Sequence, residues 1–316
     1  MYDRIKLWIG REDIGTDFPD FPRCLNNVEE RRNLTTGEVR TFGNIGNLSV
    51  SILMGGISVD GSLSKYFHGD NIHTVDRRDT AKAIEKLSDE LHVDMSKAKA
   101  TYLEFGTNFM MSKPVPLYLS RLGGVPRMKR WQPLPFTVYY HGNRTMGNYP
   151  KELAFYDKIA EAKRKKVALP DGFEGANLLR YEMRYKVGAI KKHLNIEEVT
   201  GAILSDRRFY SLMIKLYQDN YFKISRKMET IYRIGDIKTP KDAYDCLMGQ
   251  LLSESGNARI EAFMQELKEA HIFSDRKNYT LLKRKFKGLT DKASEAIPDE
   301  LIRELDDEVK NSGAYF

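Results

Sequence analysis

The sequence predicts an α+β protein, in which a central antiparallel sheet with flanking helices is followed by a small helical domain. Up to Lys186, apolar and polar side chains alternate in short segments separated by Gly, Asn and Pro, which is typical of antiparallel strands. After Lys186, apolar residues recur at every third or fourth position, which is typical of amphipathic helices. We therefore expect an α+β domain at residues 1–226 and a helical domain at residues 227–316.

The composition is that of a basic globular protein. Hydrophobic residues make up 41% of the 316 residues, and the net charge of +7 favours a polyanionic partner. No apolar run approaches the roughly 20 residues that span a bilayer, and Met1–Asp13 has no apolar signal-peptide core. Cys24 and Cys246 match no metal-binding or redox spacing. We therefore expect a protein of the reducing cytoplasm, with no membrane partner.

The first part of the chain is expected to contain mainly strands. Met1–Gly10 alternates apolar and polar residues and predicts a half-buried strand. Asp13–Arg32 is polar, contains two prolines and predicts a loop. Glu38–Phe67 predicts a meander of three strands, in which Gly and Asn supply the turns.

A polar loop with three potential metal ligands follows this meander. It contains His68, Asp70 and His73, separated by short polar steps. Such residues bind metals in some proteins, but in a loop they more often cap turns or contact a substrate. We favour capping or substrate contact here.

The next two elements are a helix and a long strand. Asp79–His92 has one apolar face and predicts a helix, with its first or second residue as the N-cap. Ser96–Phe109 predicts a central strand with Glu104 and Gly106 on its polar face. A carboxylate beside a glycine suits a divalent metal with room for a phosphate, although a wet strand face is the commoner explanation.

A basic and aromatic stretch occupies Arg121–Lys166. It holds eleven Lys or Arg and three acids, a net +8, with seven aromatic residues among them. Cations neutralise phosphates and aromatic faces stack on unpaired bases, so we favour nucleic acid over a merely solvated surface. The expected DNA-binding residues are Arg127, Lys129, Arg130, Trp131, Lys163, Arg164, Lys165 and Lys166.

A Tyr-x-Lys pair lies inside this stretch. Tyr156 and Lys158 share a face if the segment is extended, because side chains of a strand repeat every second residue. We expect a strand that ends near Tyr156, with Asp157 capping a short basic helix to Lys166.

Two more strands carry polar residues on one face. Pro133–Gly142 places His141 near its end, and Asn143–Tyr149 is expected to turn into the Tyr-x-Lys segment. Leu178–Lys186 alternates strongly and places Glu182 between two arginines. A lone histidine is usually structural, so we expect His141 to have a role in the site only if the strand that carries Glu104 lies next to it.

Helices are expected to fill the rest of the chain. Their predicted ranges are Ile196–Leu204, Phe209–Ile224, Thr239–Leu252, Asn257–His271, Asn278–Lys287 and Pro298–Lys310. The basic segment Leu281–Leu289 is as compatible with duplex DNA contact as with the solvated face of a packed helix. Tyr156 is the first candidate for a reactive tyrosine. Tyr210, Tyr217 and Tyr221 fit helix packing but remain rival candidates.

The ordered segments IHTVDRRD, KLSDELHVDMSKAKATYLEFGTNF, LAFYDK and LRYEMRYK resemble the gene II replication initiators of filamentous phages. They resemble more distantly the plasmid initiators and transfer relaxases grouped as Rep_trans. The shared pattern is a strand with an acidic residue, a Tyr-x-Lys strand and an Arg-aromatic-Glu strand, within roughly Ser49–Tyr221. The resemblance implies a sheet of the HUH-endonuclease type and a nicking-joining activity in residues 1–226.

Site roles follow from the resemblance residue by residue. Tyr156 matches the nucleophile that forms a 5′-phosphotyrosine, and Lys158 matches its lysine partner. Glu104 and Glu182 match acidic residues of the family, and His141 is added from its strand position. The His-hydrophobe-His signature of the wider HUH nucleases is missing, so the implied metal site is rich in carboxylates and suits Mg²⁺ or Mn²⁺.

The implied function is metal-dependent rolling-circle replication in a bacterial host cell. The partners would be an origin duplex, the displaced single strand, and a host helicase and polymerase. Two alternatives remain open: a conjugative-transfer relaxase of the same fold, and a non-catalytic protein that binds single-stranded nucleic acid.

Overall fold

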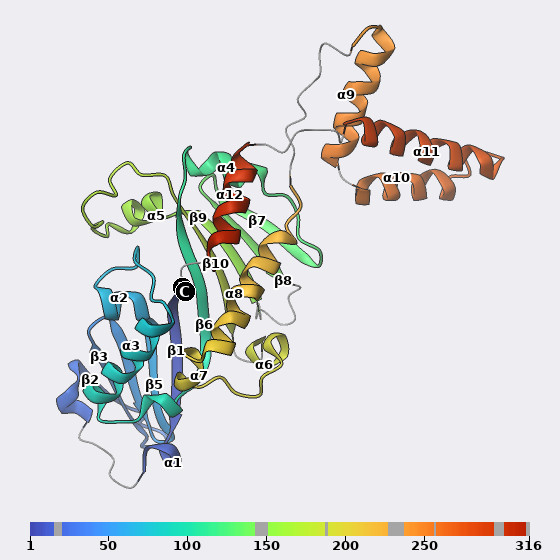
Figure 1. Ribbon diagram of the computed structural model, residues 1–316. Coiled ribbons are helices and arrows are strands. Elements are labelled where there is room, and N and C mark those ends of the chain that lie inside the picture. Colours follow the sequence, from blue (N-terminus) through green and yellow to red (C-terminus); the bar gives the residue numbers. More distant parts are fainter. Residues whose placement is uncertain are drawn as a thin grey trace. The chain divides into compact units, whose positions relative to one another are not determined.

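The computed structural model describes residues 1–15, 21–142, 151–186, 189–226, 237–255, 257–293 and 300–313. The chain forms two compact units, one of Met1–Ser225 with Glu304–Phe316 and one of Arg226–Arg303 (Figure 1). The first unit is α+β, as predicted, and the second contains helices. The helical domain was expected to reach residue 316, but from Glu304 onward the last helix belongs to the first unit instead.

A ten-stranded sheet forms the first unit, and all its paired strands are antiparallel. The strands are β1 (Tyr2–Gly10), β2 (Asn26–Arg32), β3 (Val39–Ile45), β4 (Leu48–Leu53), β5 (Gly56–Ser62), β6 (Lys99–Met110), β7 (Met128–Leu134), β8 (Thr137–Gly142), β9 (Lys151–Asp157) and β10 (Leu178–Lys186). Their order is β2-β3-β4-β5-β1-β6-β10-β9-β8-β7. Strands β1, β6 and β10 therefore meet at the centre although they are far apart in the sequence.

Helices accompany the sheet in the first unit. They are α1 (Arg11–Ile14), α2 (Leu63–His68), α3 (Arg77–Leu91), α4 (Val115–Arg121), α5 (Lys158–Lys165), α6 (Ala189–Leu194), α7 (Gly201–Leu204), α8 (Arg207–Phe222) and α12 (Glu300–Asn311), with short 3₁₀ turns at Phe21–Cys24 and Met95–Lys97. The second unit contains α9 (Pro240–Ser255), α10 (Asn257–Glu269) and α11 (Arg276–Ala293). No helix within the described ranges is long and apolar enough to cross a bilayer.

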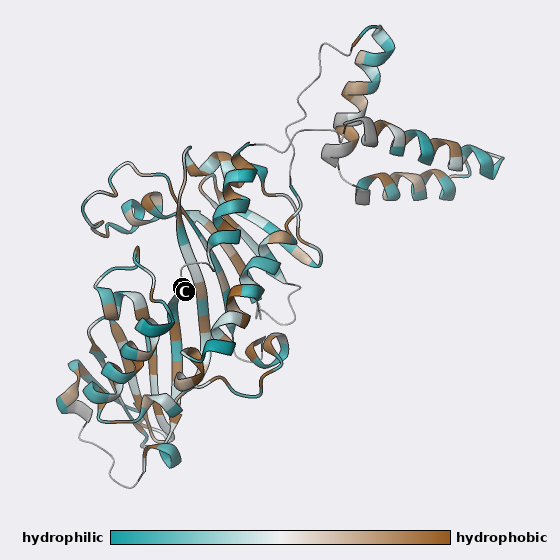
Figure 2. Cartoon of the chain, in the orientation of Figure 1, coloured by the Kyte–Doolittle hydropathy of each residue, from teal (hydrophilic) through white to brown (hydrophobic). Residues whose placement is uncertain are grey.

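Aromatic side chains join the sheet to α8. Tyr181 of β10 stacks on Phe155 of β9 with ring centroids 4.3 Å apart, and on Tyr217 of α8 at 4.2 Å. Tyr181 and Tyr217 each donate a hydroxyl hydrogen bond to the other's carbonyl at 3.1 Å. Figure 2 shows hydrophobic residues along the strands and hydrophilic residues over much of the helices. The face of the sheet that α8 covers therefore carries the aromatic part of the hydrophobic core, and the opposite face carries the polar side chains of the central strands as well as a small apolar cluster of Ile72, Ile159 and Leu178.

The structure corrects the predicted loop at Asp13–Arg32. Its end, Asn26–Arg32, forms edge strand β2, in which every residue is exposed. An edge strand without a buried face has no apolar alternation, so its sequence resembles a loop. Arg31 and Glu29 form an ion pair at 3.0 Å on one side of this strand.

Several element boundaries also differ from the predictions. The end of the predicted meander is helix α2, because the Ser62 side chain accepts a hydrogen bond from the Lys65 amide and caps a helical turn. Helix α3 is capped by Asp76, which lies before the expected cap. In the predicted helix Ile196–Leu204, only Gly201–Leu204 is helical. The predicted turn at Asn143–Tyr149 and the first residues of Pro298–Lys310 lie outside the described residues.

Candidate active site

Three carboxylates meet on the polar face of the central strands. Asp3 on β1, Glu104 on β6 and Glu182 on β10 are buried, and each offers one oxygen within 4.8 Å of the others. In the β6–β10 pair, Gly106 lies opposite Glu182, and Arg184 lies opposite Glu104. Glu104 and Glu182 therefore lie on adjacent antiparallel strands, with their carboxylates in one group.

Asp3 is the member of this carboxylate group that sequence analysis missed. Strict alternation would place Asp3 on the apolar face with Ile5, because side chains repeat every second residue. The register shifts between Tyr2, which pairs with Phe105, and Ile5, which pairs with Leu103. This bulge puts Tyr2 and Ile5 on the same face and turns Asp3 to the other.

Gly106 allows the Glu182 side chain to enter the site. A Cβ atom at Gly106 would lie 2.3 Å from the Tyr181 carbonyl oxygen and 2.9 Å from Cγ of Glu182. The glycine was expected to leave room for a phosphate, but the adjoining Glu182 side chain takes that room. Any larger residue would push β10 away from β6.

Two arginines and a tyrosine neutralise Glu182. Its Oε1 accepts hydrogen bonds from Arg180 Nε at 2.5 Å and from Tyr156 Oη at 2.6 Å, and its Oε2 accepts one from Arg184 Nη2 at 2.6 Å. Burial alone would raise the pKa of Glu182, but Arg184 and Arg180 hold that pKa well below its ordinary value. Glu182 is therefore an ionised acceptor.

Arg180 holds the centre of the network together. It is fully buried, and its Nη2 donates to Asp3 at 2.5 Å while its Nε donates to Glu182. Its Nη1 donates to the Asn71 carbonyl at 3.0 Å, which ties the loop before α3 to the sheet.

Glu104 has the opposite electrostatic behaviour. Burial and the nearby Glu182 charge raise the pKa of Glu104 to about 7, against a weaker opposing effect of Arg184, whose Nε lies 3.3 Å away. Tyr102 donates a hydrogen bond to Oε1 of Glu104 at 2.5 Å. The site thus combines one firmly ionised carboxylate with one that titrates near neutral pH.

We expect Glu104→Gln to flatten the pH dependence of stability. A carboxyl group with a pKa of about 7 when folded, against an ordinary 4.5, binds its proton more tightly in the folded state. The metal-free wild type should therefore lose stability as pH rises from about 4.5 to 7, by roughly 1.4 kcal/mol per unit of pKa shift. Urea unfolding of both proteins over this range measures the difference, and parallel curves would contradict the assignment.

Tyr156 and Lys158 lie together at the edge of this site. Tyr156 is in β9 opposite Arg180, and Lys158 is the first residue of α5, which Asp157 caps as predicted. The Lys158 ammonium lies 5.9 Å from the Tyr156 ring centroid and 2.9 Å from Glu161. Burial and the Glu182 charge raise the Tyr156 pKa well above its ordinary value, while burial and Arg180 lower the pKa of Lys158.

The rival tyrosines are on the other side of the sheet. Tyr217 packs on Tyr181, and Tyr210 packs against Phe105, so both lie on the apolar face. Tyr221 donates to Asp306 of α12 at 2.7 Å. Tyr102 is a closer rival that the sequence did not single out, because its hydroxyl contacts the carboxylate group directly.

His141 lies beside the carboxylate group but outside it. Its Nδ1 is 2.9 Å from Oε2 of Glu152, and Glu152 accepts a hydrogen bond from Arg184 at 2.5 Å. The strand β9 that carries Glu152 separates β8 from β10. Among the described residues, the group close enough to share an ion consists of Asp3, Glu104 and Glu182.

The expected DNA-binding residues near β7 divide between the two faces of the sheet. Lys129 and Trp131 lie opposite His141 and Tyr139, on the polar face. Arg130 lies on the face of α4, where it donates to the carbonyls of Leu122 at 3.0 Å and Leu119 at 3.2 Å. Its guanidinium is therefore engaged in fixing the end of α4. Arg127 is exposed in the turn before β7.

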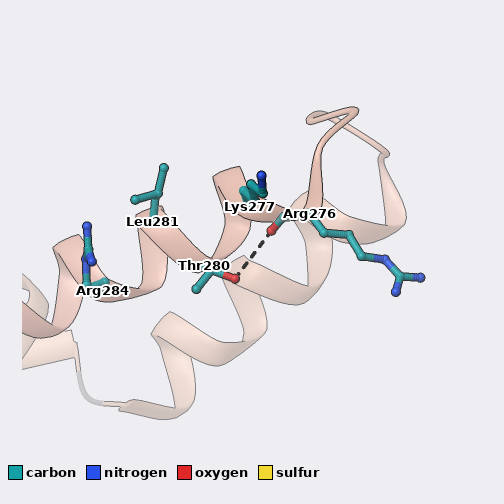
Figure 3. A pocket seen from close by; sticks show the side chains of 5 residues that line it. All are labelled: Arg276, Lys277, Thr280, Leu281 and Arg284. Carbon is teal, nitrogen blue, oxygen red and sulfur yellow. Dashed lines mark hydrogen bonds between the residues drawn. The ribbon is translucent and has the colours of Figure 1, made fainter.

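Two exposed basic surfaces lie elsewhere. Lys163–Lys166, at the end of α5, are all exposed, and Lys165 also pairs with Glu161 at 2.5 Å. Helix α11 carries seven Lys or Arg and one acid. A shallow pocket on this helix is lined by Arg276, Lys277, Thr280, Leu281 and Arg284 (Figure 3). The predicted basic segment is therefore a helix with cations on its exposed side.

The loop with His68, Asp70 and His73 is stabilised by its own contacts. Asp70 Oδ1 accepts hydrogen bonds from the amides of Ile72 and His73, each at 2.9 Å. His68 lies 3.4 Å from Asp79. The expected turn-capping role is confirmed for Asp70.

The fold and site define a protein with a buried, carboxylate-rich polar site on one face of an antiparallel sheet, next to tyrosines. The family model for the N-terminal part of the phage gene II replication-associated protein matches residues 33–203, more than half of the chain. The chain therefore belongs to this family of replication-associated proteins, and its predicted resemblance to the gene II-type initiators of phages is confirmed. The matched range includes Glu104, Tyr156, Lys158 and Glu182 but not Asp3.

Other comparisons add no functional argument. No curated protein matches the chain. Among solved structures, "Crystal structure of the di-domain ARO/CYC BexL from the BE-7585A biosynthetic pathway" is 11% identical and covers 61% of this chain and 76% of its own, with a TM-score of 0.19. A score this low supports no inference about the fold.

Proposed function

We propose that this protein starts rolling-circle DNA replication by nicking one strand at an origin, and later rejoins the strand. The observation that carries this proposal is the 2.6 Å contact between Tyr156 Oη and Glu182, a member of the carboxylate group. A tyrosine hydroxyl next to carboxylates that could hold a divalent metal ion fits phosphoryl transfer to tyrosine. The family match supplies the link to replication.

The proposed reaction is a transesterification. The Tyr156 oxygen attacks a phosphodiester phosphorus, a phosphorus–oxygen bond forms, and the bond to the 3′ oxygen breaks. The phenol proton is released to water, because Glu182 is too firmly ionised to hold it, and the 3′ oxygen takes up a proton from water as a hydroxyl. The covalent 5′-phosphotyrosine keeps the energy of the broken ester, so the reverse attack rejoins the strand.

Activation of Tyr156 requires positive charge. Its pKa is raised well above the ordinary value by burial and Glu182, so the phenol stays protonated in the free protein. Arg180 and Arg184 oppose this effect on the pKa. Lys158 adds a cation next to the ring. These three cations would stabilise the charge that develops on a phenolate and on the phosphate.

The carboxylate group fits a divalent metal ion. Asp3, Glu104 and Glu182 offer hard oxygen ligands, the type that Mg²⁺ and Mn²⁺ prefer. The raised pKa of Glu104 also fits, because a bound cation would relieve the repulsion between buried carboxylates. A bound ion would supply Lewis-acid charge for the phosphate oxygens. We propose these three residues as the ligands and leave His141 outside the set.

The direct test is a covalent-adduct assay. Protein is incubated with a single strand containing the origin and Mn²⁺, then denatured, and DNA that remains attached is measured. We expect an adduct with Mn²⁺ and none with a chelator. If no strand gives an adduct under any metal condition, the protein is a non-catalytic DNA-binding protein.

That non-catalytic alternative has its own support. Tyr156 is only 7% exposed, and Glu182 is already saturated by two arginines and the tyrosine. Buried ion networks of this kind also occur as purely structural features.

A transfer relaxase would form the same adduct, and only the DNA sequence that it nicks separates it from an initiator. In the replication reaction, a host helicase and polymerase in the bacterial cytoplasm would unwind and copy the DNA.

Neutralising the basic end of α5 should weaken DNA binding. The change replaces Lys163, Arg164, Lys165 and Lys166 with glutamine. Each phosphate contact that this change removes should reduce the slope of log affinity against log salt by about 0.7–0.9. Fluorescence anisotropy at several salt concentrations measures this slope.

The matched comparison neutralises four exposed cations of α11. These are Arg276, Lys277, Arg284 and Lys285. A smaller slope with duplex DNA identifies α11 as a DNA contact, and an unchanged slope identifies a solvated helix face. An unchanged slope in the α5 variant would contradict the role proposed for that run.

A further inference from the structure

A cluster of aromatic rings lies on the polar face of the sheet, with Trp131 exposed, Tyr139 half-buried and His141 buried. Trp131 of β7 stacks on Tyr139 of β8 with ring centroids 5.5 Å apart and planes at 26°. His141 lies 5.8 Å from each of these rings. We call these three residues the aromatic cluster. Trp131 is 52% exposed, so much of its surface is free to contact a ligand.

The strand register aligns the aromatic cluster with the carboxylate group. Trp131 lies opposite Tyr139, which in turn lies opposite Ala154. Ala154 lies opposite Glu182. Neighbouring strands are about 4.8 Å apart, so this row runs roughly 14 Å from Trp131 to Glu182. The methyl group of Ala154 is the one side chain between Tyr139 and Glu182 in the row.

Cations lie in the adjacent row of the same face, which runs from Lys129 through His141 and Glu152 to Arg184. The Arg184 guanidinium is 5.8 Å from the Tyr139 ring centroid and also donates to Glu182 at 2.6 Å. Lys129 is exposed and lies opposite His141 on this face. Aromatic faces for bases combined with cations for phosphates are how proteins hold unpaired strands. A duplex keeps its base faces stacked inside, so it cannot use these rings.

We propose that Trp131 and Tyr139 stack the unpaired bases of a single DNA strand that runs along this row toward Glu182 and Tyr156. The substrate at this face is therefore single-stranded rather than duplex DNA. The inference rests on the proposed function for the position of the reacting phosphate, but base stacking itself requires no cleavage. Its test therefore has a readout that is independent of the covalent adduct.

Tryptophan fluorescence provides that readout. The chain has two tryptophans, Trp8 and Trp131, so Trp8→Phe leaves Trp131 as the single reporter. This variant is titrated with a short oligothymidine in the presence of a chelator, which prevents metal-dependent cleavage. We expect the emission of Trp131 to be quenched as the single strand binds. A blunt duplex of the same length should bind without quenching it.

Affinity measurements with the full chain give a second, independent test. Removing one stacking ring, by Trp131→Ala or Tyr139→Ala, should weaken single-strand binding roughly 5- to 150-fold. The salt dependence should stay unchanged, because every phosphate contact remains in place. Trp131→Phe should weaken binding less, because a smaller ring remains. Tyr244→Ala, which removes an exposed tyrosine from α9, is the matched control and should have no effect.

Two results would overturn the inference. One is unchanged Trp131 emission while anisotropy shows that the oligothymidine is bound. The other is equal quenching by single strand and duplex, which would mean a contact that does not read base faces. Failure of the proposed nicking reaction would look different, since quenching would persist while no adduct forms at Tyr156.

Discussion

Tyr156→Phe should abolish the covalent protein–DNA adduct, lowering its rate of formation by roughly 10⁴-fold or more. Phenylalanine keeps the ring between Arg180 and Thr137 of the neighbouring strands but has no oxygen to attack phosphorus. Binding of single-stranded DNA should be nearly unchanged. The adduct assay with Mn²⁺ measures the first quantity, and anisotropy with a chelator measures the second.

The control for this experiment is Tyr102→Phe. Tyr102 also contacts the carboxylate group, through Glu104, and lies on the same face as Tyr156. It should keep adduct formation, with a reduced rate at most. If Tyr156→Phe still forms the adduct and Tyr102→Phe does not, the nucleophile is Tyr102 and the role proposed for Tyr156 is wrong.

Arg180→Met should have the largest effect on stability of any single change in the site. It leaves Asp3 buried without its cation and removes one of the two arginines that pair with Glu182. Removing one partner of a buried ion pair costs about 3–5 kcal/mol, because the remaining charge has neither its water nor its counter-ion. For a unit of this size, the melting temperature should fall by roughly 10 °C. Thermal unfolding monitored by circular dichroism measures the melting temperature of the variant and of the wild type.

Arg4→Met is the matched comparison for this change. Arg4 also forms a two-bonded pair with a carboxylate, Asp60, but more than half of its side chain is exposed. Its removal should cost less than about 1 kcal/mol. Adding Asp3→Asn to Arg180→Met should recover part of the lost stability, since one uncompensated charge is removed. Equal effects of the Arg4 and Arg180 variants would mean that the buried network is not under this electrostatic constraint.

The site residues on regular strands were predictable from the sequence. Glu104, Tyr156 and Glu182 occupy polar positions of strands whose other side is apolar, and a period of two fixes their common face. Pairing between strands is not encoded in a local pattern, so the neighbours of each strand had to come from the structure. Asp3 was missed for a second reason, because a bulge near the start of β1 breaks the period on which the prediction depends.

Burial was the other property that the sequence could not supply. Arg180 and Lys158 are charged, and charged side chains are usually exposed. Here Arg180 is fully buried and Lys158 is 3% exposed, because acidic residues from separate elements surround them. Arg130 is a related case, because the sequence predicted that it binds DNA. Its guanidinium instead donates hydrogen bonds to backbone carbonyls and is not available to DNA.

The strand order has a consequence for when the candidate site forms as the chain folds. Strand β10 inserts between β6 and β9, both of which precede it in the sequence. A growing chain therefore makes the two sides of this gap first and closes the sheet only when Leu178–Lys186 has left the ribosome. That last strand also brings Arg180, Glu182 and Arg184. A nascent or partly folded protein thus has Tyr156 but no assembled carboxylate group, and the proposed strand cutting would be withheld until the sheet is complete.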